Sequence, residues 1–488
     1  KWMNFINIHS IKFILFVGSL LFVFITFNNS NYLFKTDFLD DLNISRIEFI
    51  IYSLLFIFVI YIILFLIEKI ENEKVFLIIL IIVSFFLKFV WIVLIKTEPV
   101  SDFKLLLEAA NSINLGNNEF IKNSSYFNSW SYQLGFVSYQ AVLIYIFGFD
   151  IFILKFFNMI FATMTCIIIY LICKKNFNKK VGQSASILYA IYPAGIYMCS
   201  VLTNQILATF LFYFALYCSL FYYKKFAFLP IGVFIALANI IRPEGIIIIL
   251  AVIIFIFFSK YDNSIFQNTL RNYFLKLRII MLIIVVFFVV TKIFDFFIMY
   301  SDVSEYPLKN NEPLYKFVVG LNNNTTGHYS VNDTNHIFSI ENKSLRKKEL
   351  FNIIYLRLSN KHNLFNLFKD KFIIMWSDFD SSILFLDDNI FLTLKTKTIL
   401  SISEKLFYTI VVLFSLISLA FFHTKNKTYY QSYQVFLLLI IGFIFVYELI
   451  EIQTRYRFVV IPSFFILSSV SLNIFVNFLK QNKLQLNK

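Results

Sequence analysis

The sequence predicts an all-α polytopic membrane protein with about twelve transmembrane helices, outer-side juxtamembrane helices and one large extracytoplasmic loop region. Of its 488 residues, 59% are hydrophobic and only 15% are charged. Apolar runs of roughly eighteen or more residues recur along the chain, which is the length a helix needs to cross the hydrocarbon core of a bilayer. A membrane barrel would instead show ten-residue alternation, so a helical bundle is expected.

The net charge of +14 does not indicate a nucleic-acid partner. The lysines cluster in short loops between the apolar runs, as the positive-inside tendency predicts for cytoplasmic loops. We therefore use these lysines to orient the predicted helices.

Residues 1–74 are expected to form an N-terminal transmembrane hairpin from the apolar runs 11–27 and 47–67. The first run lacks a small-residue cleavage signature, which favours a retained helix over a removed signal peptide. Its N-terminus is placed inside, so the hairpin begins and ends on the cytoplasmic side.

Residues 75–299 are expected to form a transmembrane module with a first outer loop at 97–150. Within that loop the apolar run 134–147 is short. If it crossed, the lysine pairs at 174–175 and 179–180 would fall outside, against the charge rule. We therefore predict a partly embedded segment, covered by protein on the outer side. The six crossings after it are expected at residues 151–173, 181–200, 206–223, 226–241, 245–258 and 279–299.

Residues 300–400 are polar and are expected to form an extracytoplasmic region, with an aromatic patch at 372–376 that suits a membrane interface. Residues 401–488 are expected to supply the C-terminal transmembrane helices and a cytoplasmic tail. Their apolar runs lie near residues 402–422, 435–449 and 458–478.

A carboxylate pair follows the third apolar run. Asp102 lies four residues after Glu98, and apolar residues recur at helical spacing beyond it, so Asp102 is predicted to open a surface helix. One interpretation is a carboxylate that complements the helix dipole. The other is a general base at the membrane edge, where a low dielectric raises its pKa towards its working range.

Two arginine turns fall on the same predicted side. Arg242 and Glu244 flank a proline between two apolar runs, and Arg455 follows Glu451 before the last run. Structural ion pairs explain both, the second as a helical i,i+4 pair. The alternative is that the forked donors of arginine bind a lipid phosphate.

Lys88 and Lys155 lie inside apolar runs, where an ionisable group is costly; Lys155 is close enough to the interface to snorkel. The chain has no glycine-rich nucleotide loop, and its five histidines and four cysteines show no metal-ligand spacing. We expect no cofactor and no metal site, with a divalent cation as the one open alternative. An activated donor would then come from the membrane.

The order of these motifs resembles the GT-C superfamily of polyprenyl-phosphate-sugar-dependent glycosyltransferases, in particular the family 39 and aminoarabinose-transferase-like branch. The resemblance covers roughly residues 75–478. It is carried by Pro99 to Asp102, Leu115-Gly116, the partly embedded segment with Leu134-Gly135, Arg242 to Gly245, and Glu451 to Tyr456.

The resemblance implies an inverting transfer of one sugar from a polyprenyl-phosphate donor to an acceptor hydroxyl at the outer face of a bacterial plasma membrane. Asp102 matches the catalytic base, with Glu98 beside it. The predicted donor-phosphate ligands are Arg455, Arg242 and Tyr456, and the predicted substrate-binding residues are Glu451, Gln453, Glu244, Asn204 and His328.

The chain departs from the pattern in its second outer loop, where Thr203-Asn204-Gln205 replaces the acidic residue of many members. The expected acceptor is a glycopolymer, glycolipid or protein, in contact with membrane lipids and without nucleic acid. Two alternatives stay open: a flippase or exporter of lipid-linked sugars, and a polymerase or ligase of lipid-linked oligosaccharides.

Overall fold

The computed structural model describes residues 2–33, 45–258, 270–386, 392–424 and 430–486, and these residues form helices without any strand. Among these described residues, six helices are long and apolar enough to cross a membrane: Phe13–Asn31, Ile47–Glu68, Glu73–Leu94, Ile151–Asn176, Tyr273–Tyr300 and Leu394–Ala420. Five shorter apolar helices accompany them: Gln205–Ser219, Phe228–Ile241, Gly245–Phe257, Tyr433–Leu449 and Ile461–Val476. The predicted all-α polytopic class is confirmed, whereas the number of twelve crossings stays a prediction.

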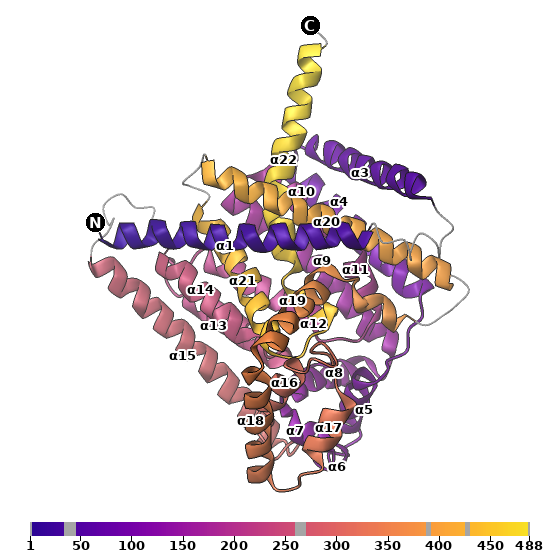
Figure 1. Ribbon diagram of the computed structural model, residues 1–488, viewed down its shortest axis with the longest axis vertical. Helices are drawn as coiled ribbons and strands as arrows, with labels where there is room; N and C mark the ends of the chain where they lie inside the picture. Colours follow the sequence, from indigo (N-terminus) through magenta and orange to yellow (C-terminus); the bar gives the residue numbers. More distant parts are fainter. Residues whose placement is uncertain (1, 34–44, 259–269, 387–391, 425–429, 487–488) are drawn as a thin grey trace.

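The first two helices pack on the C-terminal ones (Figure 1). Helix α1 (Trp2–Leu33) lies along α20 (Leu394–Thr424), and its Phe22 ring stacks on Phe464 with the centroids 5.2 Å apart. Helix α3 (Arg46–Glu68) begins at a capping box, and Asn473 donates a 2.9 Å hydrogen bond to Glu68 at its end. The connection between them, residues 34–44, lies outside the described residues.

A core of apolar helices follows. These are α4 (Glu73–Leu94), α9 (Ile151–Asn176), α10 (Lys179–Ala190), α12 (Gln205–Ser219), α13 (Phe228–Ile241), α14 (Gly245–Phe258) and α15 (Leu270–Tyr300). The prediction of one continuous helix over residues 181–200 is wrong. Helix α10 ends at Ala190 because Pro193 disfavours helical backbone at Tyr192, and a separate short helix, α11 (Pro193–Tyr197), begins there.

Lys88 contacts the end of α10 at that break. Its ammonium is buried and donates to the hydroxyl of Ser84 at 2.8 Å and to the carbonyl of Ala190 at 3.3 Å. The Ala190 carbonyl belongs to the last turn of α10, where helical partners run out. The buried ammonium of Lys88 is therefore satisfied by hydrogen bonds within the protein, and its role is structural.

The first predicted outer loop consists of short helices: α5 (Asp102–Asn114), α6 (Glu119–Lys122), α7 (Ser125–Ser129) and α8 (Leu134–Phe147). Asp102 opens α5 as predicted, and Gly116, with a φ of 71°, lies just beyond its end. Helix α8 packs along α5. Its partly embedded position in a bilayer stays a prediction.

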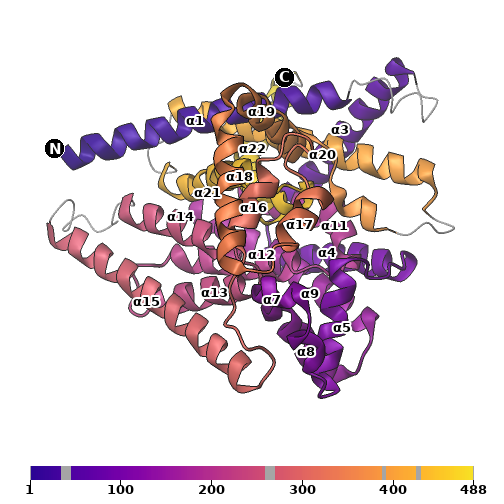
Figure 2. The same ribbon diagram turned by 60° about the horizontal axis from the view of Figure 1, so that its bottom comes forward.

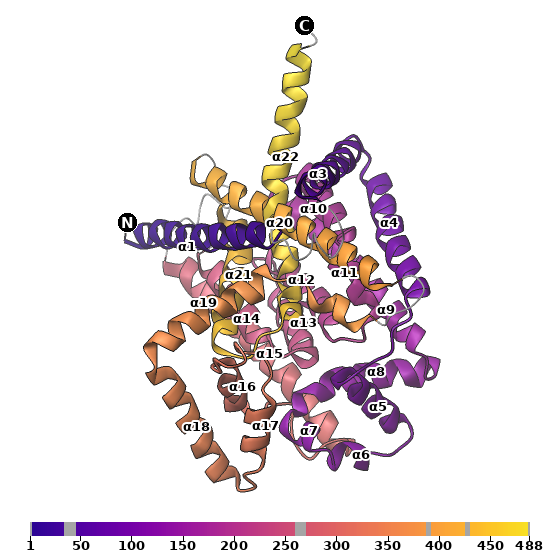
Figure 3. The ribbon, with the colours of Figure 1, turned by 45° about the vertical axis from the view of Figure 1, so that its right-hand side comes forward.

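The predicted extracytoplasmic region contains α16 (Pro313–Gly320), α17 (Val331–Phe338), α18 (Lys343–Ser359) and α19 (Lys361–Ser377), followed by the 3₁₀ turn η3 (Ser381–Phe385). Helices α16 to α18 lie with α5 to α8 at the end of the molecule opposite the C-terminus (Figures 1 and 3). Figure 2, turned so that this end comes forward, shows α16 to α19 as one cluster.

The last elements are α21 (Tyr430–Leu449), the 3₁₀ turn η4 (Thr454–Val459) and α22 (Ile461–Leu486). The segment between α21 and η4, residues 450–453, is joined to the region of α16. The amide of Glu451 donates to the carbonyl of Lys316 at 3.1 Å, and that of Ile452 donates to Gly327 at 3.0 Å. Two distant parts of the sequence thus meet at this segment.

Candidate functional site

The stretch before Asp102 is held by a buried lysine. Lys155, on α9, is 5% exposed and donates to the carbonyl of Thr97 at 2.5 Å and to its hydroxyl at 2.8 Å. The Thr97 hydroxyl in turn donates to the carbonyl of Ser200 at 2.5 Å. Lys155 therefore does not snorkel to an interface; it fixes the backbone that leads from α4 to Asp102.

Ser101 turns that backbone into α5. Its φ of 52° is unusual for a residue with a side chain and costs about 1 kcal/mol or more. Such a conformation persists only where its surroundings impose it. The hydrogen bonds from Lys155 hold the backbone at Thr97, four residues before Ser101. The start of α5 at Asp102 is therefore anchored close to a fixed stretch of backbone.

Asp102 keeps an exposed side chain, yet its pKa is raised. Burial by the surrounding protein is the largest cause. The positive charges of Arg455 and Lys316 oppose the rise, as does a hydrogen bond with Tyr126, while the charge of Glu451 adds to it. Charges on α16 and on the chain between Glu451 and Arg455 therefore both act on the Asp102 carboxylate.

Arg455 has an unused hydrogen-bonding edge. Its Nε donates to Gln453 at 2.6 Å, and the guanidinium lies over the rings of Phe103 at 4.8 Å and Phe385 at 5.3 Å. In the described part of the chain, its two terminal nitrogens have no hydrogen-bond or ion-pair partner. A stacked, half-buried guanidinium with free terminal nitrogens is suited to a phosphate oxygen pair.

Glu451 does not pair with Arg455, so the expected helical i,i+4 pair is wrong. Helix α21 ends at Leu449, and the chain reaches η4 only at Thr454, so no helix spans the two residues. Glu451, 5% exposed, forms its ion pair with Lys316, whose side chain is 28% exposed. Burial lowers the pKa of Lys316, but the Glu451 carboxylate, with smaller contributions from Tyr456 and Tyr132, outweighs this, and the pKa is raised.

Sequence reasoning missed Lys316, Tyr126 and Tyr132. Lys316 lies on α16 in the long polar region, where no local pattern separates it from other lysines. The two tyrosines lie among other aromatic residues of the first outer loop, and no spacing in the sequence separates them from these. Burial raises the pKa of both tyrosines, so each keeps its hydroxyl proton and remains available as a hydrogen-bond donor.

Arg242 is committed to a local network. Its Nε donates to Glu244 at 2.6 Å and its Nη1 to Asn204 at 3.1 Å, while Tyr447 donates to the same Glu244 oxygen at 2.6 Å. Of the two interpretations of Arg242, a structural ion pair or a phosphate ligand, this geometry fits the ion pair. The guanidiniums of Arg242 and Arg455 both lie over the ring of Tyr456, at 5.1 and 5.5 Å, so that ring links the two arginines.

The remaining predicted residues lie further out. Glu98 is exposed and lines a cavity of about 10 Å³ together with Phe103 and Phe385, the two rings that carry Arg455. His328 is half-buried, and its Nδ1 lies 3.0 Å from the carbonyl of Thr325 rather than against another predicted site residue. The described ranges contain no group of three or more histidine, cysteine, aspartate or glutamate side chains that could hold a metal ion.

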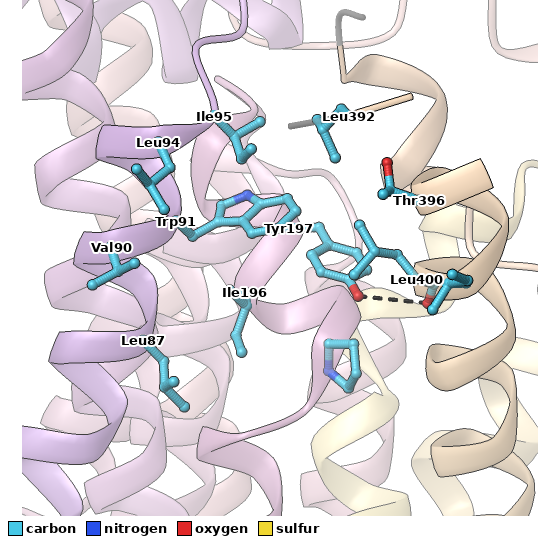
Figure 4. Close-up of a pocket in the computed structure, with 12 residues that line it drawn as sticks. Leu87, Val90, Trp91, Leu94, Ile95, Ile196, Tyr197, Leu392, Thr396 and Leu400 are labelled. Atoms are coloured by element: carbon cyan, nitrogen blue, oxygen red, sulfur yellow. Dashed lines mark hydrogen bonds between the residues drawn. The ribbon is translucent and has the colours of Figure 1, made fainter. Parts of the chain in front are cut away.

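An apolar groove of about 500 Å³ opens between α4, α11 and α20 (Figure 4). Trp91 forms its centre, with its ring 4.6 Å from Tyr197 and its Nε1 donating to Ser200 at 3.2 Å. None of the described residues that line it is charged; they are Leu87, Val90, Trp91, Leu94, Ile95, Pro193, Ile196, Tyr197, Leu392, Thr396, Ile399 and Leu400.

The end of the groove at Ile95 and Leu392 connects to Arg455 through η3. Ile95 and Leu392 share an apolar cluster with Ile383 of η3. In the same turn, the Ser381 hydroxyl accepts the amide of Arg455 at 3.2 Å. The groove and the side chain of Arg455 therefore both adjoin η3.

Comparison with known proteins gives one family match. Residues 136–291 match the model described as "Dolichyl-phosphate-mannose-protein mannosyltransferase", a family of the GT-C class. This stretch is less than half of the chain; it includes Asn204, Arg242 and Glu244 but neither Asp102 nor Arg455. The match places a GT-C glycosyltransferase domain in the chain, and the predicted resemblance and enzyme class are confirmed. The comparison with curated proteins found no match.

Several solved structures resemble the chain. One is the archaeal oligosaccharyltransferase AglB from Archaeoglobus fulgidus in complex with an inhibitory peptide and a dolichol-phosphate, with 14% identity, a TM-score of 0.49, and coverage of 86% of this chain and 52% of that one. Another is the Archaeoglobus fulgidus oligosaccharyltransferase tethered with an acceptor peptide containing the NVT sequon, with 14% identity, a TM-score of 0.49 and coverage of 84% and 51%. The chain spans about half the length of these structures.

Proposed function

Because residues 136–291 carry a GT-C glycosyltransferase domain, we propose that this protein moves one sugar from a polyprenyl-phosphate donor to an acceptor hydroxyl at the outer face of a bacterial plasma membrane. The reaction inverts the anomeric carbon, and Asp102 is the general base. The observation that supports the proposal is that the charge of Arg455 acts on Asp102, while the terminal nitrogens of Arg455 have no partner among the described residues and its guanidinium lies over Phe385 of η3, the turn that also adjoins the apolar groove.

The donor's lipid chain occupies the groove between α4, α11 and α20. An isoprenoid chain is apolar throughout, and all lining residues of the groove except Thr396 are apolar or aromatic, so the chain can pass from the bilayer into the groove without exposing apolar surface to water. The donor phosphate then lies at the Ile95 end, where η3 leads to Arg455. Only part of a long polyprenyl chain fits in about 500 Å³, so the rest extends into the bilayer.

The chemical step requires a base and a stabilised leaving group. The acceptor oxygen attacks the anomeric carbon while Asp102 takes the hydroxyl proton, and the bond from that carbon to the phosphate oxygen breaks. The electron pair of that bond leaves with the polyprenyl phosphate, whose extra negative charge Arg455 and Lys316 stabilise. The raised pKa of Asp102 strengthens it as a base.

The other residues have supporting roles. Tyr126 orients the Asp102 carboxylate through its hydrogen bond, and Gln453 holds Arg455 through its Nε. Glu451 positions Lys316, and Tyr456 joins Arg455 to the network of Arg242, Glu244 and Asn204. The acceptor is a glycopolymer, glycolipid or protein that approaches Asp102 from its exposed side.

The test is a transfer assay in proteoliposomes, with an undecaprenyl-phosphate-linked radiolabelled sugar as donor and a cell-envelope extract as acceptor. Asp102→Asn should lower the transfer rate by about 10² to 10⁴, the usual contribution of a general base, while donor binding persists. Glu108→Gln is the matched control, since Glu108 is an exposed carboxylate on the same helix and should leave the rate unchanged.

Full activity of Asp102→Asn would refute its role as the base. Movement of labelled donor across the bilayer without sugar transfer would favour the exporter instead. Addition of many sugars to one acceptor would favour the polymerase or ligase.

A further inference from the structure

Lys371 of α19 joins two backbone segments that are far apart in the sequence. Its side chain is 0% exposed, and its ammonium donates to the carbonyls of Gly320 at 2.8 Å, Glu448 at 2.6 Å and Ile450 at 2.9 Å. These carbonyls belong to the end of α16, the last turn of α21 and the 450–453 segment. Since a lysine ammonium has three protons, every donor of Lys371 is used.

The backbone around Lys371 approaches too closely for side chains. A Cβ at Gly320 would lie 2.3 Å from the carbonyl carbon of Ile450, and one at Gly327 would lie 2.8 Å from Cε of Lys371. The carbonyls at the ends of α16 and α21 also lack helical partners, so they need a donor from elsewhere. Lys371 supplies that donor at the point where the segments meet.

The groups that flank Asp102 lie on the segments that Lys371 joins. Lys316 precedes Gly320 by one helical turn on α16, and Glu451 directly follows Ile450. The amide of Glu451 donates to the carbonyl of Lys316, and their side chains form the ion pair described above. A shift of α16 against the 450–453 segment would therefore separate this pair and move both charges relative to Asp102.

We propose that Lys371 is a positioning residue for the candidate active site: it fixes α16 against the 450–453 segment and so holds the Lys316–Glu451 pair beside Asp102. Its effect on catalysis rests on the proposed function, whereas its effect on the two segments does not. It acts through backbone carbonyls and does not touch the donor or the acceptor.

The first measurement is hydrogen exchange on the full-length protein in nanodiscs, without any substrate. In Lys371→Met, which keeps the length of the side chain but has no donor, the amides of Glu451 and Ile452 should exchange about tenfold faster, the factor expected from one lost hydrogen bond. Lys369→Met is the matched control, because Lys369 is exposed on the same helix. Lys371→Gln keeps an amide donor and provides a second variant if Lys371→Met does not fold.

The second measurement is the pH dependence of transfer by the same variants. Asp102 is faced by Arg455, Lys316, Glu451 and Tyr126, and Lys316 affects it more than Glu451 does. Loosening the pair should therefore move the acidic limb of the rate profile to higher pH and lower kcat about tenfold, with a smaller change in the donor KM. General destabilisation would not move that limb.

Unchanged exchange at Glu451 and Ile452 in Lys371→Met would overturn the inference. Loss of folded protein in both Lys371 variants, with Lys369→Met intact, would also overturn it, because Lys371 would then hold the whole fold. Faster exchange in a protein that transfers no sugar would uphold the positioning role and reject the proposed function.

Discussion

Replacing Arg455 tests whether its free guanidinium edge binds the donor phosphate. Arg455→Met keeps an apolar side chain of similar reach beside Phe103 and Phe385 but removes the guanidinium that lies over their rings, with its charge and both unused nitrogens. Arg455→Lys keeps the charge but loses the fork and the flat surface that stacks on the rings. The two variants therefore separate the charge from the geometry.

The expected loss follows from the contacts. Hydrogen bonds to charged groups contribute about 1.5 to 3 kcal/mol each, and the two free nitrogens can form two of them. Allowing for water that replaces part of the interaction, we expect about 3 to 4 kcal/mol, or roughly a factor of 10² to 10³ in kcat/KM, for Arg455→Met. Arg455→Lys should lose about tenfold. The donor's phosphodiester gains negative charge as the sugar leaves, so most of the loss should appear in kcat.

The assay measures initial transfer rates over a range of donor concentrations in mixed micelles, with thermal unfolding as the control for folding. Arg455 is only half-buried and forms no ion pair with the residues that the structure describes, so both variants should unfold within a few degrees of the parent protein. A wild-type kcat/KM in Arg455→Met would refute the reasoning. Equal activity of the lysine and arginine proteins would refute the bidentate geometry.

The pKa of Asp102 predicts opposite pH shifts for the two charges beside it: a base must be unprotonated, so the rate rises as the pH passes the pKa of Asp102. Glu451→Gln removes a charge that raises this pKa and should move the acidic limb of the rate profile to lower pH, whereas Lys316→Met removes a charge that lowers it and should move the limb to higher pH. Limbs that move in the same direction would contradict the expectation. Filling the groove with Ile196→Trp should raise KM about tenfold for a long-chain polyprenyl donor and hardly at all for a two-isoprene donor, as measured by parallel rate curves. Val142→Trp, on an exposed face of α8, is the control, and equal effects on both donors would exclude the groove as the chain site.

The class and the placement of Asp102 were predictable because they depend on local patterns. Long apolar runs specify helices, and the spacing after Asp102 specifies α5. Arg242 and Glu244 form an ion pair across a proline. Their separation of two residues in the sequence already indicated this pair. These features need no knowledge of how distant segments pack.

The partners of the site depend on long-range packing and were not predictable. Lys316 pairs with Glu451 across most of the second half of the chain, and Lys155 reaches back to Thr97 from a different helix. The i,i+4 spacing of Glu451 and Arg455 was misleading because α21 ends before Glu451. Pro193 was visible in the sequence, but the apolar residues around it concealed the break in the helix.

The central claim is that a polyprenyl phosphate binds between Arg455 and Asp102. It is tested most directly by the cryo-EM structure of the Asp102→Asn protein in nanodiscs with an undecaprenyl-phosphate-linked sugar. We expect phosphate density about 3 Å from the terminal nitrogens of Arg455, the sugar next to residue 102, and the lipid chain along Trp91 in the groove. Phosphate density at a site away from Arg455, or a lipid chain outside the groove, would contradict it.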